Sequence, residues 1–173
     1  HKLSLEAAAR RVRYDVLQRI ASDRRARVIA VGHTADDQVE TILMHWLRGA
    51  GLTGLRGMLA VQRLGSGILL VRPLLDVTRA DVEAYCTAHN LHPRLDRSNR
   101  DERLWRNRIR HTILPTLEQV SPRLRQTTLR TARILADDDA FLDACVSEAW
   151  PRLAAVDDVS VRIDAALWRR QAP

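Results

Sequence analysis

A short β-branched segment followed by a polar turn and an amphipathic helix is the feature that most restricts how this chain can fold. Residues 27–32 (RVIAVG) are apolar enough for a strand buried on both faces, which is typical of a parallel sheet. His33 and Thr34 then lead into a predicted helix at about residues 35–48. Residues 67–71 (GILLV) predict another strand. Strands that alternate with helices indicate an α/β layer with parallel strands.

Helical periodicity fills most of the remaining chain. It predicts four further helices, at about residues 4–22, 78–90, 101–114 and 121–150. Pro115 and Pro151 are expected to end the last two of these helices. Two strands are too few for a complete doubly wound sheet, and the pattern after Pro115 is helical apart from a weak apolar alternation at residues 159–163. We therefore expect residues 1–115 to form part of a parallel-sheet α/β domain and residues 116–173 an all-helical segment.

The charge balance favours a polyanionic partner. The net charge is +7 with a pI of about 10.8, and Lys2 is the only lysine among 28 cationic side chains. The planar guanidinium of arginine suits phosphate oxygens, and a basic domain attracts nucleic acid. A GC-rich genome would explain the preference for arginine over lysine, but it would not explain the net excess of positive charge. Aromatic residues make up only 4% of the chain, which argues against base stacking on an aromatic sheet.

Cysteine usage and hydropathy point to the cytoplasm. Cys86 and Cys145 are far apart and have no matching histidine spacing, which argues against a disulfide framework, a zinc site or a CxxC redox pair. No stretch approaches the roughly 18 apolar residues that a membrane-spanning helix needs. We expect a protein of the reducing cytoplasm, without a membrane partner.

The segment from Gly32 to Thr41 (GHTADDQVET) carries the most specific chemistry. It lies where the carboxyl end of a strand meets a helix, which is the usual ligand crevice of an open α/β sheet. One interpretation is that Thr34 caps the helix while Asp36 and Asp37 complement its dipole. A predicted buried stripe favours a second interpretation, and its members are Val39, Ile42, Leu43, Trp46 and Leu47. Asp36 and Glu40 lie along its edge and Asp37 points further out, so carboxylates beside the crevice would hold Mg²⁺ or a substrate amine, with His33 in reach.

Two other clusters flank this segment. The glycines at 49, 51, 54 and 57 follow a helix, so they predict a helix stop and a tight turn and not a dinucleotide-binding loop. In the basic helix, one face holds Arg103, Arg106, Asn107 and Arg110, and the other holds Trp105, Ile109 and Ile113. Such an arginine face is either solvated or grips a polyphosphate or an RNA backbone.

Taken together, these segments resemble the tRNA(Ile)-lysidine synthetases of the N-type ATP pyrophosphatase (PP-loop) group. The matching residues are Ser4, Glu6, Ala9, Arg10, Arg13 and Tyr14; the GHxxDDQxET run 32–41; Arg48, Gly49, Gly51, Gly54, Leu55, Gly57 and Met58; Arg72 to Leu75; Arg79; Tyr85; and the DxSNxDxxxxRNxIR run 96–110. They keep the family order over about residues 4–125. The fold implied is a partial adenine nucleotide alpha hydrolase-like domain.

The resemblance implies ATP-dependent ligation of lysine to the wobble cytidine of an isoleucine tRNA with a CAU anticodon. ATP adenylates the C2 oxygen of the cytidine and releases pyrophosphate, and the lysine ε-amine then displaces AMP. The partners implied are this tRNA, L-lysine and ATP, and Mg²⁺ is expected with ATP. Carried over by motif, His33 and Asp36 lie at the reacting centre, and Asp37 and Glu40 recognise lysine. The arginines so matched are Arg10, Arg13, Arg106 and Arg110, near phosphates or the anticodon. Of these we expect Arg10, Arg13 and Arg106 to bind ATP phosphates. Arg110 and its neighbour on the arginine face, Arg103, are expected to contact the tRNA.

One motif of the family is not found within the 173 residues. The SGGxDS loop, whose backbone amides cradle pyrophosphate, would lie before Ser4, so we expect either a fragment of a longer enzyme or a degenerate relative. Two rival interpretations stay open, a related tRNA thiolase and a non-catalytic RNA-binding remnant. Paired cysteines would favour the thiolase, and the two distant ones here do not. Three retained acids in the crevice weaken the case for a remnant.

Overall fold

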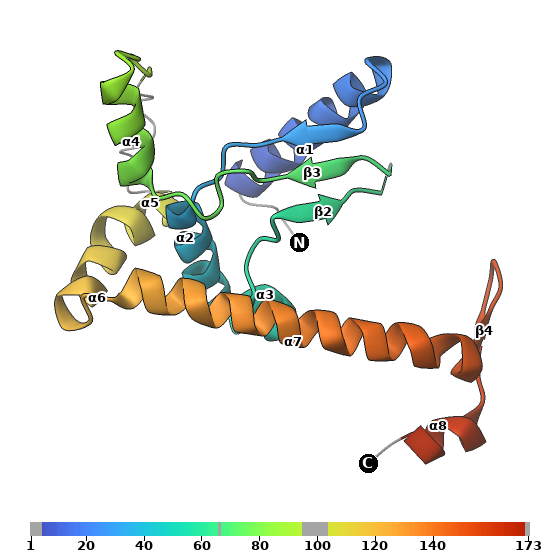
Figure 1. The fold of residues 1–173 in the computed structure, drawn as a ribbon. Helices are drawn as coiled ribbons and strands as arrows, with labels where there is room; N and C mark the ends of the chain where they lie inside the picture. Colours follow the sequence, from blue (N-terminus) through green and yellow to red (C-terminus); the bar gives the residue numbers. More distant parts are fainter. Residues whose placement is uncertain (1–4, 66, 95–103, 172–173) are drawn as a thin grey trace.

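The computed structural model describes residues 5–65, 67–94 and 104–171 (Figure 1). Ser4, where the first predicted helix begins, and Arg103, an expected tRNA contact, lie outside these residues. The elements before the gap at 95–103 are α1 (Leu5–Asp23), β1 (Val28–Ala30), α2 (Ala35–Trp46), α3 (Leu52–Leu55), β2 (Val61–Arg63), β3 (Leu69–Val71) and α4 (Arg79–Ala88). After it come α5 (Trp105–Arg108), a π-helical turn η2 (Ile109–Ile113), α6 (Leu114–Val120), α7 (Leu124–Leu153), β4 (Ala154–Val156), β5 (Val161–Ile163) and α8 (Ala165–Gln171).

The α/β class predicted from the sequence is confirmed, with a mixed sheet. The strand order is β1-β3-β2, with β1 parallel and β2 antiparallel to the central β3. Leu69 is the register partner of both Val28 and Arg63. The sequence did not reveal β2, because all three of its residues are exposed and it lacks the apolar pattern by which strands are recognised.

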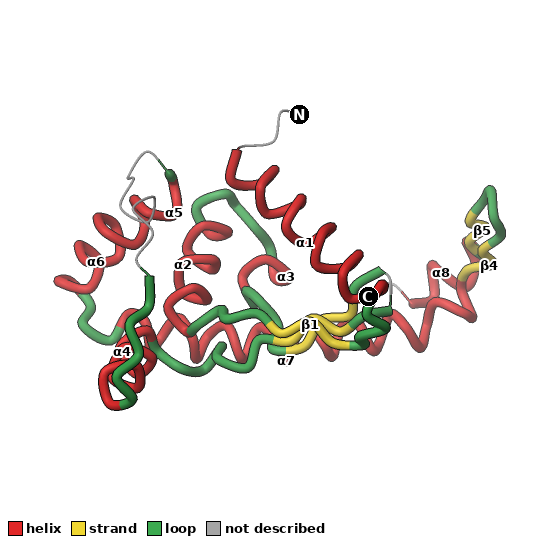
Figure 2. Tube along the Cα trace, turned by 90° about the horizontal axis from the view of Figure 1, so that it is seen from above, coloured by secondary structure: helices red, strands yellow, loops and turns green. Residues whose placement is uncertain are grey.

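Two small cores hold the fold together. In the first, α1 packs on one face of the sheet through Ala21, against Ile29, Ile68 and Leu70 (Figure 2). The second joins α2 to the helices after residue 104, with Val39, Ile109 and Leu114 almost fully buried. Burying each of these side chains contributes roughly 1.5–3 kcal/mol. The second core therefore fixes the start of α2 against the arginine-bearing helix.

Two expected helix ends were wrong. Pro115 does not end a helix, because it occupies the first turn of α6, where the missing N–H costs little and the fixed φ suits the helix. The π-helical turn η2 lies directly before it. Pro151 does not stop α7 either, and the helix ends at Leu153. A proline so near the end of a helix removes one hydrogen bond without preventing the final turn.

The sequence predicted an all-helical segment for residues 116–173. The structure differs, because two strands follow α7. Residues 154–163 form a hairpin in which Ala154 pairs with Ile163 and Val156 with Val161. The weak apolar alternation at residues 159–163 thus marks a strand. Figures 1 and 2 show the hairpin and α8 at the far end of α7, away from the sheet.

The first half of α7 is anchored to the domain. It passes beside α2 and α3 (Figure 1). Asp139, which is buried on α7, forms an ion pair with Arg56 and accepts a hydrogen bond of 3.0 Å from Thr53 Oγ1. None of the helices in the described part of the chain is both long and apolar enough to cross a membrane.

Candidate functional site

The site begins at the N-terminus of α2, directly after β1. Thr34 caps the helix from an extended backbone conformation, as the first interpretation of the sequence predicted. The capping is reciprocal, because the backbone N–H of Asp37 donates to Thr34 Oγ1 (3.5 Å) and the backbone N–H of Thr34 donates to Asp37 Oδ2 (2.9 Å). This arrangement fixes the Asp37 carboxylate and leaves its Oδ1 atom for other partners.

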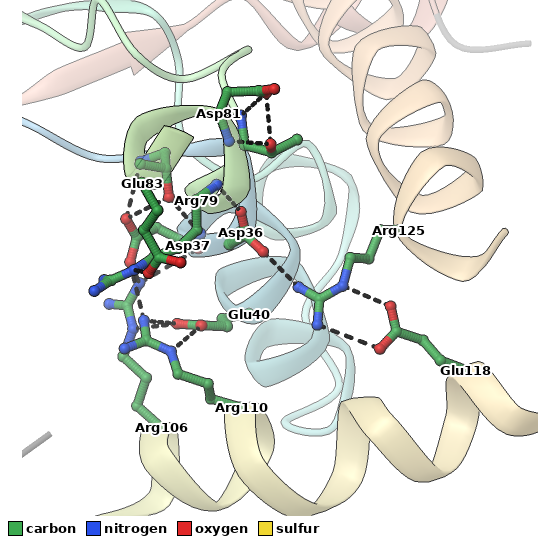
Figure 3. A network of polar contacts seen from close by, with 12 residues as sticks. Asp36, Asp37, Glu40, Arg79, Asp81, Glu83, Arg106, Arg110, Glu118 and Arg125 are labelled. Atoms are coloured by element: carbon green, nitrogen blue, oxygen red, sulfur yellow. Dashed lines mark hydrogen bonds and ion pairs between the residues drawn. The ribbon is translucent and has the colours of Figure 1, made fainter. Parts of the chain in front are cut away.

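Asp37 and Glu40 together hold two arginines of the helix after residue 104 (Figure 3). Arg106 donates from Nε to Glu40 Oε2 (2.8 Å) and from Nη2 to Asp37 Oδ1 (3.0 Å). Arg110 donates from Nε to Glu40 Oε1 (2.5 Å) and from Nη2 to Glu40 Oε2 (2.9 Å), with Asp37 Oδ1 at 3.3 Å. We call these four residues the acid–arginine cluster. Its two negative charges balance its two positive charges.

Burial and charge act in opposite directions within this cluster. Burial of Asp37 opposes its ionisation, but the hydrogen bond from the Thr34 backbone and the positive charge of Arg106 outweigh it and hold the pKa of Asp37 below its ordinary value. The hydrogen bond to Glu40 raises the pKa of Arg110. Glu40 is only 1% exposed. A carboxylate so buried is stable only with such paired donors.

Asp36 has different partners from its neighbour. Its Oδ2 atom accepts from the backbone N–H of Arg79 (2.6 Å), at the start of α4, and its Oδ1 atom accepts from Arg125 Nη1 (2.8 Å) on α7. Arg125 Nε donates in turn to Glu118 Oε1 (2.6 Å) on α6. Asp36 therefore joins α2, α4 and α7 (Figure 3). Neither Arg125 nor Glu118 was recognised from the sequence, since no local pattern relates residues so far apart.

His33 directly precedes the cap residue Thr34 and lies near several arginines. Burial, assisted by the nearby charges of Arg10, Arg72 and Arg106, outweighs the opposing charge of Asp37 and lowers the pKa of His33 to about 4. The ring is therefore neutral at pH 7. Its Nδ1 atom is buried and finds no hydrogen-bond partner in the described part of the chain. A neutral imidazole with one unused nitrogen suits a hydrogen bond to a ligand better than proton abstraction at neutral pH.

The structure gathers most, but not all, of the residues singled out in the sequence. It brings together His33, Asp36, Asp37, Glu40, Arg10, Arg106 and Arg110. Arg13 is exposed on α1 and forms no ion pair with a described residue. The predicted buried stripe is correct for Val39 and Ile42 but wrong for its far end, because Trp46 is 63% exposed where α2 leaves the core. Asp37 does not point away from the site but into the cluster.

The acids of the site pair with arginines. Within residues 5–65, 67–94 and 104–171, no three His, Cys, Asp or Glu side chains are arranged to hold a metal ion. The carboxylates of Asp36, Asp37 and Glu40 are directed at guanidinium groups instead. A guanidinium is a charged nitrogen group, so these contacts resemble those that a substrate amine would make.

Comparison with known proteins identifies the family of this chain. The sequence model of the PP-loop domain matches residues 1–117. The tRNA(Ile)-lysidine synthase of Geobacter sulfurreducens is 46% identical over 157 residues, which cover 91% of this chain and 33% of that protein. The synthase of Dehalococcoides mccartyi is 40% identical over 177 residues, covering 100% of this chain and 38% of that protein. The chain thus spans about a third of the length of these curated relatives.

A solved structure shares the fold at lower sequence similarity. The U34-tRNA thiolase NcsA from Methanococcus maripaludis, determined with its 4Fe-4S cluster, superimposes with a TM-score of 0.54 at 19% identity, over 78% of this chain and 45% of that chain. This likeness concerns the fold alone. Since the family model covers well over half of the residues, the chain belongs to the PP-loop domain family, and within it the chain is similar to the tRNA(Ile)-lysidine synthases.

Proposed function

We propose that the intact protein ligates lysine to the wobble cytidine of an isoleucine tRNA with a CAU anticodon, at the expense of ATP. The cytidine C2 oxygen attacks the α-phosphorus of ATP, and the bond to pyrophosphate breaks. The lysine ε-amine then attacks C2, loses a proton and expels AMP. The observation that carries the proposal is the Gly32–Thr41 segment, which builds the capped start of α2 and its acid–arginine cluster in a chain similar to lysidine synthases over 91% of its length.

The acid–arginine cluster supplies both kinds of group that this reaction needs. Asp37 and Glu40 are proposed to bind an ammonium group of lysine, and Arg106 and Arg110 phosphate oxygens of ATP or tRNA. In the structure these residues neutralise one another. A polyanion that draws the guanidinium groups away would leave two carboxylates for the ammonium. This order of events makes lysine binding depend on prior binding of ATP or tRNA.

His33 and Asp36 are proposed to act at the reacting centre, with Arg10 and Arg13 toward the phosphates. Because the His33 ring is neutral at pH 7, it would position the base or the leaving AMP by a hydrogen bond. Asp36, held by Arg125 and the Arg79 backbone, is restrained in one orientation. Mg²⁺ is expected as the companion of the ATP phosphates, which would be its ligands.

The test is incorporation of labelled lysine into tRNA(Ile) bearing a CAU anticodon, with release of AMP and pyrophosphate. Asp37→Asn removes a charge-assisted hydrogen bond worth roughly 1.5–3 kcal/mol, so it should raise the lysine concentration required about tenfold or more. Adenylation of the tRNA should change far less. Equal loss of both steps would assign Asp37 to ATP instead of lysine. Absence of lysine incorporation by the intact wild-type protein would overturn the function itself.

The thiolase alternative is decided by the same assay. The structural likeness to a tRNA thiolase shows only the fold. Both cysteines are free and lie on separate helices, Cys86 on α4 and Cys145 on α7. Incorporation of sulfur into tRNA, without lysine, would transfer the proposal to that reaction.

A further inference from the structure

Three arginines gather at the end of the sheet opposite α2. Arg25 and Arg27 lie in the turn between α1 and β1, and Arg63 ends β2. Figure 1 shows this turn and the β2–β3 turn at the same end of the sheet. Since Leu69 pairs with both Val28 and Arg63, the backbone of Arg63 lies two strand spacings from that of Val28, or about 10 Å. Two segments distant in sequence thus present positive charge side by side.

The three arginines border an open hollow of about 450 Å³, which we call the basic hollow. Its lining consists of Arg25, Ala26, Arg27, Arg63, Gly67, Ile68 and Leu69. No aromatic side chain belongs to this lining, so the hollow offers no platform for a stacked base. A lining of arginines and small or apolar residues suits the oxygens of a phosphate backbone.

The turns that carry the arginines are fixed by backbone hydrogen bonds. The N–H of Arg25 donates to Ser22 O (3.0 Å), and the N–H of Leu69 donates to Arg27 O (2.9 Å). Arg25 has a φ of 54°, in the left-handed region where a helix ordinarily ends on glycine. A side chain there costs about 1–2 kcal/mol. These hydrogen bonds hold the backbone of Arg25 and Arg27 in place, which lowers the entropy lost when their side chains bind a ligand.

Charge pairing distinguishes the arginines of the basic hollow from the three beside α2. Arg106, Arg110 and Arg125 beside α2 all pair with carboxylates. Neither Arg25, Arg27 nor Arg63 forms an ion pair with any residue that the structure describes, and all three are exposed. Their charge is thus available to an external anion, in a chain with a net charge of +7.

We propose that the basic hollow binds phosphates of an RNA backbone, as a second contact for the tRNA that reaches the acid–arginine cluster. Arg27 and His33 are separated by six residues along β1 and the extended connection to α2, which spans at most about 20 Å. One tRNA arm is long enough to reach both places. Phosphate contacts carry no sequence information, so the hollow orients the tRNA and does not select it. The choice of tRNA rests on the proposed function, whereas binding to RNA does not.

The test compares two triple variants with equal loss of charge. One replaces Arg25, Arg27 and Arg63 by Gln, and the control replaces the exposed residues Arg130, Arg169 and Arg170 by Gln. Binding to tRNA(Ile) and to a tRNA with another anticodon is measured from low to high salt. Each lost phosphate contact lowers the slope of log K against log salt by about 0.7–0.9, so the first variant should lose about 2–3 units of slope with both tRNAs. The control should lose less than one.

The outcomes separate this inference from the proposed function. An unchanged slope, or an equal loss in the control, would overturn the inference even if the protein makes lysidine. A loss confined to the first variant supports it even if no lysidine is made. Competition by inorganic pyrophosphate as strong as that by RNA would assign the hollow to free polyphosphate and would also overturn it. Unchanged thermal midpoints of both variants exclude unfolding as the cause.

Discussion

Glu40 is the most buried charge of the acid–arginine cluster, and its environment sets what a substitution there must cost. The side chain is 1% exposed and accepts hydrogen bonds from both Arg106 and Arg110. Glu40→Gln keeps the size but removes the charge, so two partly buried guanidinium groups lose the more buried of their two carboxylate partners. Breaking a buried ion pair in this way costs about 3–5 kcal/mol. We expect the free energy of unfolding, measured by chemical denaturation at pH 7, to fall by about that amount.

The matched control is Glu83→Gln on α4. Glu83 also pairs with an arginine, Arg79 at 2.9 Å, but both side chains are largely exposed. A pair of this kind contributes about 0.3–0.5 kcal/mol. Similar effects of the two substitutions would show that Glu40 is not held in a buried network.

His33 should make the free energy of unfolding depend on pH. Burial and the neighbouring arginines lower its pKa to about 4 in the folded state, against about 6.5 in an unfolded chain. Between these values the unfolded state binds a proton that the folded state lacks. The contribution of His33 is therefore complete above pH 6.5 and is lost as the pH falls toward 4. His33→Gln should lose less stability than the wild type between pH 7 and pH 4.5 in denaturant titrations, and parallel curves would contradict the assigned pKa.

At the scale of elements, Arg125 connects α7 to the start of α2. Its guanidinium reaches Asp36 on α2 and Glu118 on α6, so the long helix and the proposed reacting centre share one ion-pair network. Arg125 is a positioning residue in this description, because it acts on the reaction through Asp36. Any displacement of the first turn of α7 would move a hydrogen-bond partner of Asp36.

We expect Arg125→Ala to slow pyrophosphate release by the intact protein about tenfold or more, since it removes a charge-assisted hydrogen bond worth roughly 1.5–3 kcal/mol from Asp36. Arg133→Ala is the control on the same helix. Arg133 pairs with Asp76 at 2.7 Å, but both side chains are exposed and the pair does not include Asp36. Arg125→Lys should restore part of the rate. Equal rates in the Arg125→Ala and Arg133→Ala proteins, with equal stability, would remove the positioning role.

Some of the helices and strands could be predicted from the sequence and others could not. The parallel pair β1 and β3, the capped start of α2 and the helix stop at Gly49 were predictable, because each follows from local pattern or local backbone preference. Strand β2 was not, since its stability comes from pairing with β3 and not from an apolar face. The prediction that a helix ends at Pro115 was wrong because tertiary packing again outweighs the local pattern. The packing of Leu114 in the second core continues the helix past the proline.

At the scale of the whole molecule, the residue types of the site were predictable but their pairing was not. The sequence assigned acids to an amine and arginines to phosphate as separate groups. The fold places Arg106 against Glu40, a contact that depends on how α5 and η2 pack on α2 through Ile109. The missed partner Arg125 lies 89 positions from Asp36. Contacts of this range are set by tertiary packing, which no local periodicity encodes.

Pyrophosphate release from ATP tests the 173-residue chain taken alone. Phosphoryl transfer requires backbone donors and cations fixed around the leaving pyrophosphate. The strand β1 leads to α2 through a connection with a single glycine, Gly32, and not through a glycine-rich loop.

The glycines at 49–57 are no substitute for that loop. They follow α2, whose 12 residues put them roughly 18 Å from the helix start that carries the site. Arg10 and Arg106 supply positive charge but no backbone cradle. The purified 173-residue chain, mixed with ATP, tRNA and lysine, should therefore release no pyrophosphate above the background of a sample without protein. Sustained release by the pure chain would show that the arginines suffice and that this account of phosphate binding is wrong.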